Sequence, residues 1–228
     1  MSYTIKEVDF PIIQNSPQYF KIVKLTRDNA KDLSMFIFDD KSPLFEYLVT
    51  KEVIRVMHLM SEIGSYHKKL IVVEHEGTKE IVGFSFISVL LNPINLKPIN
   101  EASIISIVVD EVHRNKGLMR AMIDKMKSIF SGIALTCSPS KADIYKRMGF
   151  TISGSFQTHL CMSLGNLTIG AKSLSIDDET VMREPHVRDA LNTAIKKHGS
   201  DTISRAEKEL ISAFHSATQE AEKYKEEQ

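Results

Sequence analysis

One stretch of the sequence, from residue 104 to residue 127, constrains the fold more than any other. Its first part, 104–108, is an apolar run that predicts a buried strand. A polar turn follows, and apolar residues then recur at helical spacing over 120–127. Backbone N–H groups at a helix start have no acceptor within the helix, and the helix dipole makes that end positive. The turn around Gly117 is therefore predicted to bind an anion, such as a phosphate or pyrophosphate.

A second strand and helix follow this turn in the sequence. The apolar run 133–137 predicts another buried strand, and 138–144 is typical of a short helix. The segment Tyr145–Phe150, with the sequence YKRMGF, comes directly after it.

The turn and this second unit together resemble the GNAT superfamily of acyl-CoA-dependent N-acyltransferases. The pyrophosphate loop of that family has the form Arg/Gln-x-x-Gly-x-Gly/Ala, and residues 114–119 match its first two anchors. Residues 145–150 reproduce a second family motif, Tyr-x-x-x-Gly-Phe. Met119 departs from the family because glycine or alanine is preferred there, and Ser138 stands where members often carry asparagine. The resemblance covers roughly residues 18–163.

The resemblance implies an acetyl-CoA site and no metal. Pantetheine would lie along the strand that precedes the turn, and the amides of 114–120 would hold the pyrophosphate. The cofactor-binding residues implied in this way are Ile107, Val108, Val109, Arg114, Asn115, Lys116, Gly117, Leu118, Met119, Arg120 and Ser138.

Catalysis of acyl transfer to an amine requires a base, because an alkyl ammonium has a pKa of about 10 and must first lose a proton. By resemblance, Tyr145 is the general acid that protonates the departing CoA thiolate. In some family members a glutamate on the strand before the turn acts as the base, and this chain has Ser103 at that position. Glu101 lies two residues earlier on the same strand face. It is either a base that acts through a water or a surface charge.

The expected function is therefore transfer of an acetyl group from acetyl-CoA to a primary amine of a small molecule, peptide or protein, by direct attack in a ternary complex. The alternative is a catalytically silent GNAT-like module that binds acyl-CoA or a protein partner. Lys plus Arg and Asp plus Glu number 29 each, so no net charge attracts nucleic acid or an anionic membrane. The sequence has no apolar run long enough to span a bilayer and no signal peptide pattern, which favours a cytoplasmic location.

The order of elements predicts an α/β (α+β) fold, and by resemblance a mixed, mostly antiparallel sheet flanked by helices. We expect a strand at 19–25, then a helix to about Ile37 capped by Thr26 or Asp28. A longer helix begins at Ser42-Pro43. Strands at 70–77 and 81–87 form a hairpin, and two more strands end near Met162.

The expected domains are residues 1–165, an acetyltransferase domain, and 166–228, a C-terminal helical extension. Amphipathic stripes on either side of Gly199 predict two helices in the extension. They form a hairpin packed on the chain's own core, a homodimerisation arm, or a lid over the acceptor site. Cys137 and Cys161 lie in apolar segments, which favours buried thiols over a disulfide or a metal pair.

Overall fold

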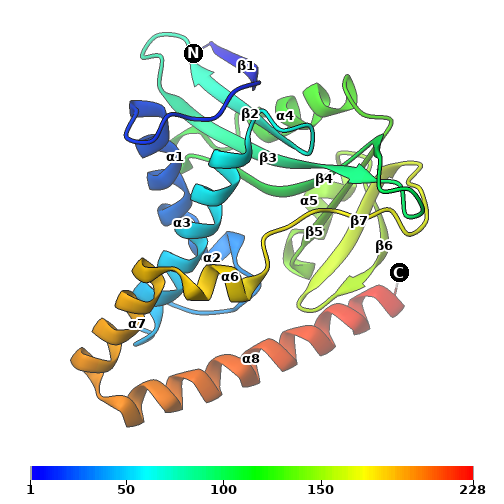
Figure 1. The fold of residues 1–228 in the computed structure, drawn as a ribbon. Coiled ribbons are helices and arrows are strands. Elements are labelled where there is room, and N and C mark those ends of the chain that lie inside the picture. Colours follow the sequence, from blue (N-terminus) through cyan, green and yellow to red (C-terminus); the bar gives the residue numbers. More distant parts are fainter. Residues whose placement is uncertain (1, 228) are drawn as a thin grey trace.

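A seven-stranded sheet organises the chain in the computed structural model, which describes residues 2–227 (Figure 1). The strands lie in the order β1 (Tyr3–Val8), β2 (Lys68–His75), β3 (Ile81–Leu91), β4 (Pro98–Val109), β5 (Gly132–Cys137), β7 (His159–Gly165) and β6 (Thr151–Phe156). Neighbouring strands are antiparallel except β4 and β5, which are parallel. The predicted fold class, a mixed and mostly antiparallel sheet flanked by helices, is confirmed.

Helices pack on both faces of this sheet because successive apolar residues of the covered strands point alternately to the two faces. On one face, α1 (Pro17–Asp28) and α3 (Phe45–Glu62) pack on Leu70 and Val72 of β2. On the other face, α4 (Leu118–Lys127) packs on Ile71 and Val73. This second face also carries α5 (Ala142–Lys146), which follows a short 3-10 helix, η2 (Pro139–Lys141).

The prediction of a strand at 19–25 is wrong, because these residues belong to α1. Ser16 caps the helix by accepting a hydrogen bond from the Tyr19 amide (3.2 Å), and Pro17 occupies its first turn. The buried residues Tyr19, Ile22 and Leu25 recur every three positions, which is helical spacing. The expected helix to Ile37 is also wrong: α2 (Ala30–Leu33) is one short turn, followed by a loop.

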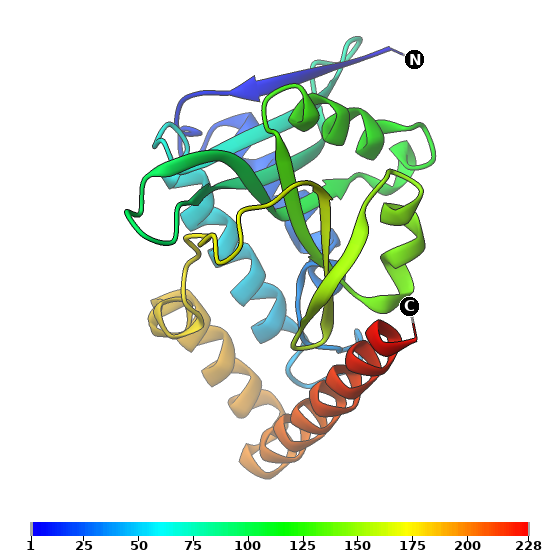
Figure 2. The ribbon, with the colours of Figure 1, turned by 90° about the vertical axis from the view of Figure 1, so that its right-hand side faces the viewer.

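In the described residues three helices follow the last strand, one more than the two predicted: α6 (Asp178–Arg183), α7 (Pro185–His198) and α8 (Ser200–Glu226). They pack on the rest of the chain. Ala194 of α7 and Ile203 and Ala206 of α8 bury Leu44 and Leu48 at the start of α3. The far end of α8 reaches β6 and β7, where Ala221 enters the main core cluster (Figure 2). Among the described residues, α8 therefore contacts both the α3 side and the β6–β7 side of the molecule.

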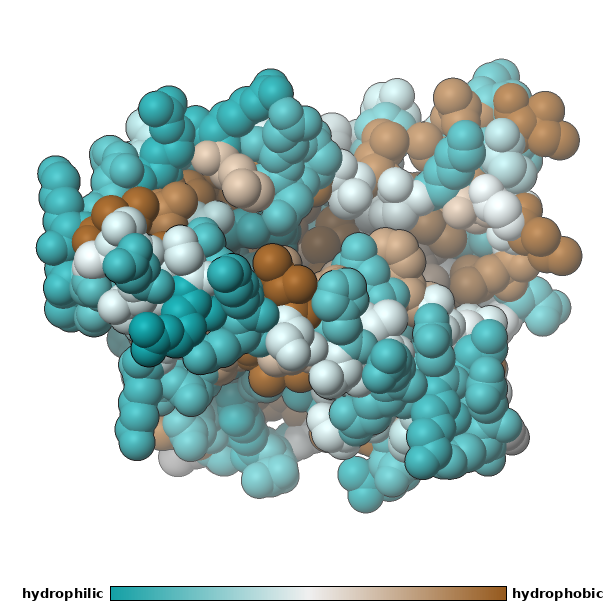
Figure 3. Space-filling model, turned by 90° about the horizontal axis from the view of Figure 1, so that it is seen from below, coloured by the Kyte–Doolittle hydropathy of each residue, from teal (hydrophilic) through white to brown (hydrophobic). Residues whose placement is uncertain are grey.

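The face formed by these helices is mostly hydrophilic. Figure 3, seen from below, shows teal side chains over most of the surface and brown groups gathered at the upper right. Within residues 2–227, no helix is both long and apolar enough to cross a membrane.

Candidate functional site

The parallel strands β4 and β5 pair only along their first halves. Their register runs from Glu101 opposite Gly132 to Ile104 opposite Leu135, and no pairing continues beyond it in the described chain. An irregularity in the β3–β4 register, which leaves Ile105 without a partner in β3, falls at the same place. Strand β4 continues to Val109 with its β5-facing edge unpaired, so that backbone groups are open to a ligand along this edge.

A cavity of about 450 Å³ lies where the two strands separate. Its walls are the ends of β4 and β5, the loop before α4, η2 and α5, and the turn between α1 and α2. Of the cofactor-binding residues expected from the sequence, those that line it are Ile107, Val108, Val109, Arg114, Asn115, Gly117, Leu118, Met119, Arg120 and Ser138. Lys116 does not line it, and its Nζ donates to the Val112 carbonyl (3.0 Å).

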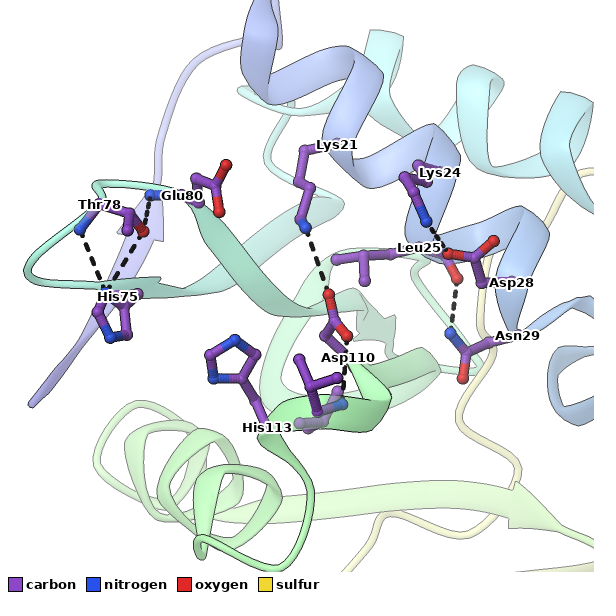
Figure 4. A network of polar contacts seen from close by, with 12 residues as sticks. Lys21, Lys24, Leu25, Asp28, Asn29, His75, Thr78, Glu80, Asp110 and His113 are labelled. Carbon is purple, nitrogen blue, oxygen red and sulfur yellow. Dashed lines mark hydrogen bonds and ion pairs between the residues drawn. The ribbon is translucent and has the colours of Figure 1, made fainter. Parts of the chain in front are cut away.

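Polar contacts at Asp110 and at Arg114 hold the loop before α4 against α1 and the residue that follows it, and Figure 4 shows the contact of Asp110 with Lys21. Asp110 caps the 3-10 helix η1 (Glu111–His113) and also accepts a bond from Lys21 Nζ of α1 (3.3 Å). The guanidinium of Arg114 donates to Asn29 Oδ1 (2.6 Å) and to the Val109 carbonyl (3.3 Å). The Arg114 side chain thus fixes the shape of the loop.

Two left-handed residues shape the loop, Asn115 (φ 60°) and Gly117 (φ 76°). The first backbone hydrogen bond of α4 runs from the Ala121 amide to the Gly117 carbonyl (2.9 Å). The amides of residues 118–120 precede this bond and have no acceptor within the helix. A Cβ at Gly117 would meet no atom within 4 Å, so the loop is open on this side. Successive amides in such a turn, at a helix N-terminus, suit an anion.

The side chains of the first turn of α4 leave these amides accessible. Met119, which departs from the family pattern, packs against the main core cluster. Arg120 donates to the Arg147 carbonyl at the end of α5 (3.1 Å). Neither side chain therefore disturbs the anion site that is expected at the amides of this turn.

Tyr145 of α5 lines the cavity. Its ring is buried (6 % exposed) and meets the Phe150 ring edge-on, with 5.9 Å between centroids. Within the described chain its hydroxyl has no hydrogen-bond partner. Burial raises the pKa of Tyr145 above its ordinary value, so the phenol keeps its proton across the physiological range. Burial also raises the pKa of the nearby Cys137 thiol to about 11.

The cavity is also lined by residues that the sequence analysis missed: Asn29, Asp32, Leu33, Lys141 and His159. Lys141 Nζ and Asp32 Oδ1 form an ion pair (2.8 Å) between η2 and α2. His159 is the first residue of β7, directly after the β6–β7 turn. Burial, and then the charge of Lys141, lower the pKa of His159 to about 4. Its imidazole is therefore neutral at neutral pH.

Glu101 and Ser103 lie in the paired half of β4 and do not line the cavity. Both carboxylate oxygens of Glu101 accept hydrogen bonds from Thr168, from its amide (2.8 Å) and from its hydroxyl (2.7 Å). Neither of the two sequence alternatives for Glu101 anticipated these bonds. They anchor the segment that follows β7, and the placement of Glu101 and Ser103 argues against either residue as the base.

The low pKa of His159 makes stability depend on pH. The unfolded chain binds a proton at its imidazole near pH 6.5, whereas the folded chain binds one only near pH 4. Acidification through this window therefore favours unfolding. We expect the fall in Tm between pH 7 and pH 4.5 to be smaller in His159→Gln than in the wild type, by calorimetry. The exposed His198→Gln variant is the control, and an equal fall in all three proteins would contradict the assignment.

Residues 66–152 match a family model described as an acetyltransferase (GNAT) domain. The structure is similar to that of the PaiA N-acetyltransferase from Thermoplasma acidophilum in complex with coenzyme A (TM-score 0.55, 10 % identity, 72 % of this chain and 99 % of that chain). A putative acetyltransferase from Pyrococcus furiosus is also similar (TM-score 0.50, 18 % identity, 68 % and 97 %). No curated protein matches the chain in sequence.

Proposed function

We propose that this chain, whose residues 66–152 match the model of a GNAT acetyltransferase domain, transfers the acetyl group of acetyl-CoA to a primary amine, by direct attack in a ternary complex. One observation carries the proposal. The unpaired edge of β4, the open amides before α4 and the hydroxyl of Tyr145 border a single cavity. These three groups suit an extended ligand that has an anionic end and a reactive end.

The binding roles follow from the two halves of this cavity. The edge of β4 that faces away from β3, from Ile107 to Val109, would offer backbone hydrogen bonds to the amide groups of pantetheine, beside the bond that the Val109 carbonyl accepts from Arg114. The amides of 115–120 and the N-terminal dipole of α4 would bind the pyrophosphate. Ser138, whose hydroxyl lies 3.0 Å from that of Ser140, stands at the end of β5 and would contact the cofactor from the other side.

The chemistry needs no covalent intermediate on the protein, because acetyl-CoA brings an acyl group that is already activated as a thioester. Cys137 is the thiol in this cavity, and its pKa of about 11 keeps it protonated and poorly nucleophilic. Tyr145 carries a proton at neutral pH and would give it to the sulfur as the thiolate leaves. These properties favour direct transfer over a ping-pong reaction.

The test is an amine-dependent release of free CoA thiol from acetyl-CoA. The panel is ethanolamine, lysine amide and a short peptide with a free N-terminus, with mass spectrometry of each product. Thiol release that depends on an amine, with one acetyl group added to that amine, is the expected result. Saturable binding of acetyl-CoA without turnover of any amine would instead support the silent acyl-CoA-binding module.

The phosphate cradle makes a separate prediction. In Gly117→Glu a carboxylate stands at the open side of the loop, and the left-handed backbone is strained as well. We expect acetyl-CoA affinity, measured by calorimetry, to fall by roughly 10–100-fold, since charge repulsion and a lost contact together amount to about 1.4–2.8 kcal/mol.

Gly117→Asn is the matched control, because asparagine tolerates the left-handed conformation and is uncharged. It should retain most of the affinity. If Gly117→Glu bound acetyl-CoA as tightly as the wild type, the pyrophosphate would have to lie elsewhere.

A further inference from the structure

Two polar residues of the cavity reach it from opposite faces of the sheet. Tyr145 belongs to the core cluster that includes Leu160 and Met162 of β7. Successive residues of a strand point to opposite faces, so His159, next to Leu160, points to the other face. Both Tyr145 and His159 nevertheless line the cavity, because the gap between β4 and β5 opens it to both faces. A group held in this gap would have a phenol on one side and an imidazole on the other.

The contacts of His159 leave one nitrogen available. Its Nδ1 is buried and has no hydrogen-bond partner in residues 2–227. Its Nε2 is not among the buried, unbonded atoms of that range and forms no hydrogen bond there, so it is the accessible nitrogen of a residue that lines the cavity. In the tautomer with the proton on Nδ1, the lone pair of Nε2 can accept a proton.

We propose that His159 is the general base of the reaction and takes the proton of the acceptor amine on Nε2. This inference rests on the proposed function. Asn29, Asp32 and Leu33 form the wall on the α1–α2 side, from which the amine would approach. The amine thus meets the thioester on the face opposite Tyr145.

The step balances with the groups at hand. The ammonium first loses one proton to solvent. The nitrogen lone pair of the neutral amine then forms the new bond to the carbonyl carbon, and the C–S bond breaks with its electron pair on sulfur. Sulfur takes the proton of the Tyr145 hydroxyl, and the amine proton passes to His159. Solvent then carries that proton from His159 back to Tyr145, which restores both residues.

Burial, and then the charge of Lys141, keep His159 in the proton-accepting form. Lys141 from η2 is the cation that acts on it, and Asp32 from α2 partly balances Lys141 through their ion pair. Cys137 and Tyr145, the titratable groups on β5 and α5 that line the cavity, both have a raised pKa and are uncharged. A neutral imidazole at this place does not repel an incoming ammonium, and it holds no proton of its own on Nε2.

Chemical rescue separates a base from a structural residue. With the best amine of the panel, His159→Ala should lose roughly 10²–10⁴-fold in kcat, the usual contribution of a positioned base. Added imidazole should restore part of the rate, and the rescue should rise with pH as the fraction of neutral imidazole rises. Pyrazole has the same size but is a much weaker base, so it should not rescue.

The controls make each outcome decisive. His198→Ala, an exposed histidine at the end of α7, should keep full turnover and respond to neither compound. If His159→Ala does not fold, His159→Gln should show the same loss of kcat with unchanged acetyl-CoA affinity. Wild-type turnover in a folded variant, or equal rescue by pyrazole and imidazole, would overturn the proposal. A wild type that binds acetyl-CoA but acetylates no amine would instead defeat the proposed function itself.

Discussion

Deletion of residues 166–228 is expected to abolish stable folding of the remaining chain. Leu44, Leu48 and Ile54 of the α3 region are almost fully buried, and they pack against α6, α7 and α8. Full exposure of such a side chain costs about 1.5–3 kcal/mol. The sum for three, about 5–9 kcal/mol, approaches the whole stability of a typical domain, about 5–15 kcal/mol.

Charged contacts add to this loss. Lys51 and Arg55 of α3 both bond Asp178 of α6, and His58 bonds Glu184 (2.8 Å). The Lys51 side chain is only 6 % exposed, so removing Asp178 leaves a buried ammonium without its carboxylate partner. Lys68 and Ser88 also donate to the Leu174 carbonyl, which the deletion removes.

Expression of residues 1–165, with circular dichroism and thermal unfolding, measures this effect. A point variant checks it in the full chain: Ala206→Asp places a charge in the buried contact with α3, whereas Ile211→Asp alters an exposed position of the same helix. Ala206→Asp should lower Tm strongly and Ile211→Asp should not. A truncated chain that unfolds cooperatively at the wild-type Tm would show that the helices are dispensable.

Tyr145→Phe is expected to reduce kcat by roughly 10–10³-fold while acetyl-CoA affinity changes little. The substitution keeps the ring and its edge-on contact with Phe150 and removes only the hydroxyl. Because that proton is needed as the thiolate leaves, the loss falls on the transition state and not on binding. Steady-state kinetics and calorimetry of acetyl-CoA binding measure the two quantities.

Tyr224→Phe is the matched control, because it removes a phenol hydroxyl from α8, where the ring lies against Lys146 and not in the cavity. It should leave kcat unchanged. Full activity in Tyr145→Phe would assign the proton of the leaving thiol to water or to the substrate.

The second half of the sheet could be predicted from the sequence because its signals are local. The strands β4 and β5 are apolar runs, and Gly117 marks the turn between β4 and α4. The hairpin of β2 and β3 and the start of α3 after Ser42-Pro43 were also predicted. In each case the pattern needed for the element lies within a few residues.

The N-terminal region shows why the other elements were harder to predict. The apolar residues of 19–25 fit both the alternation of a strand and the spacing of a helix. The N-cap at Ser16, followed by Pro17, favours the helix. Strand β1 is only partly buried, so it lacks the apolar run that indicates a strand. It is an edge strand stabilised by pairing with β2, a partner far away in the sequence.

The candidate site likewise contains some residues that the sequence predicted and others that it did not. The loop before α4 and Tyr145 carry motifs, and the structure brings them to one cavity. His159 and Asp32 carry no motif, because they reach the cavity from the start of β7 and from α2, whose contacts there are long-range. Glu101 was a candidate by strand alternation alone, which does not reveal that β4 and β5 separate only after Ile104.

The most direct test of the account is a crystal structure of the protein with acetyl-CoA. We predict pantetheine along the edge of β4 from Ile107 to Val109, with the pyrophosphate on the amides before and within the first turn of α4. The thioester sulfur should lie within hydrogen-bond distance of the Tyr145 hydroxyl. Acetyl-CoA bound outside the gap between β4 and β5, or a thioester remote from Tyr145, would contradict the account.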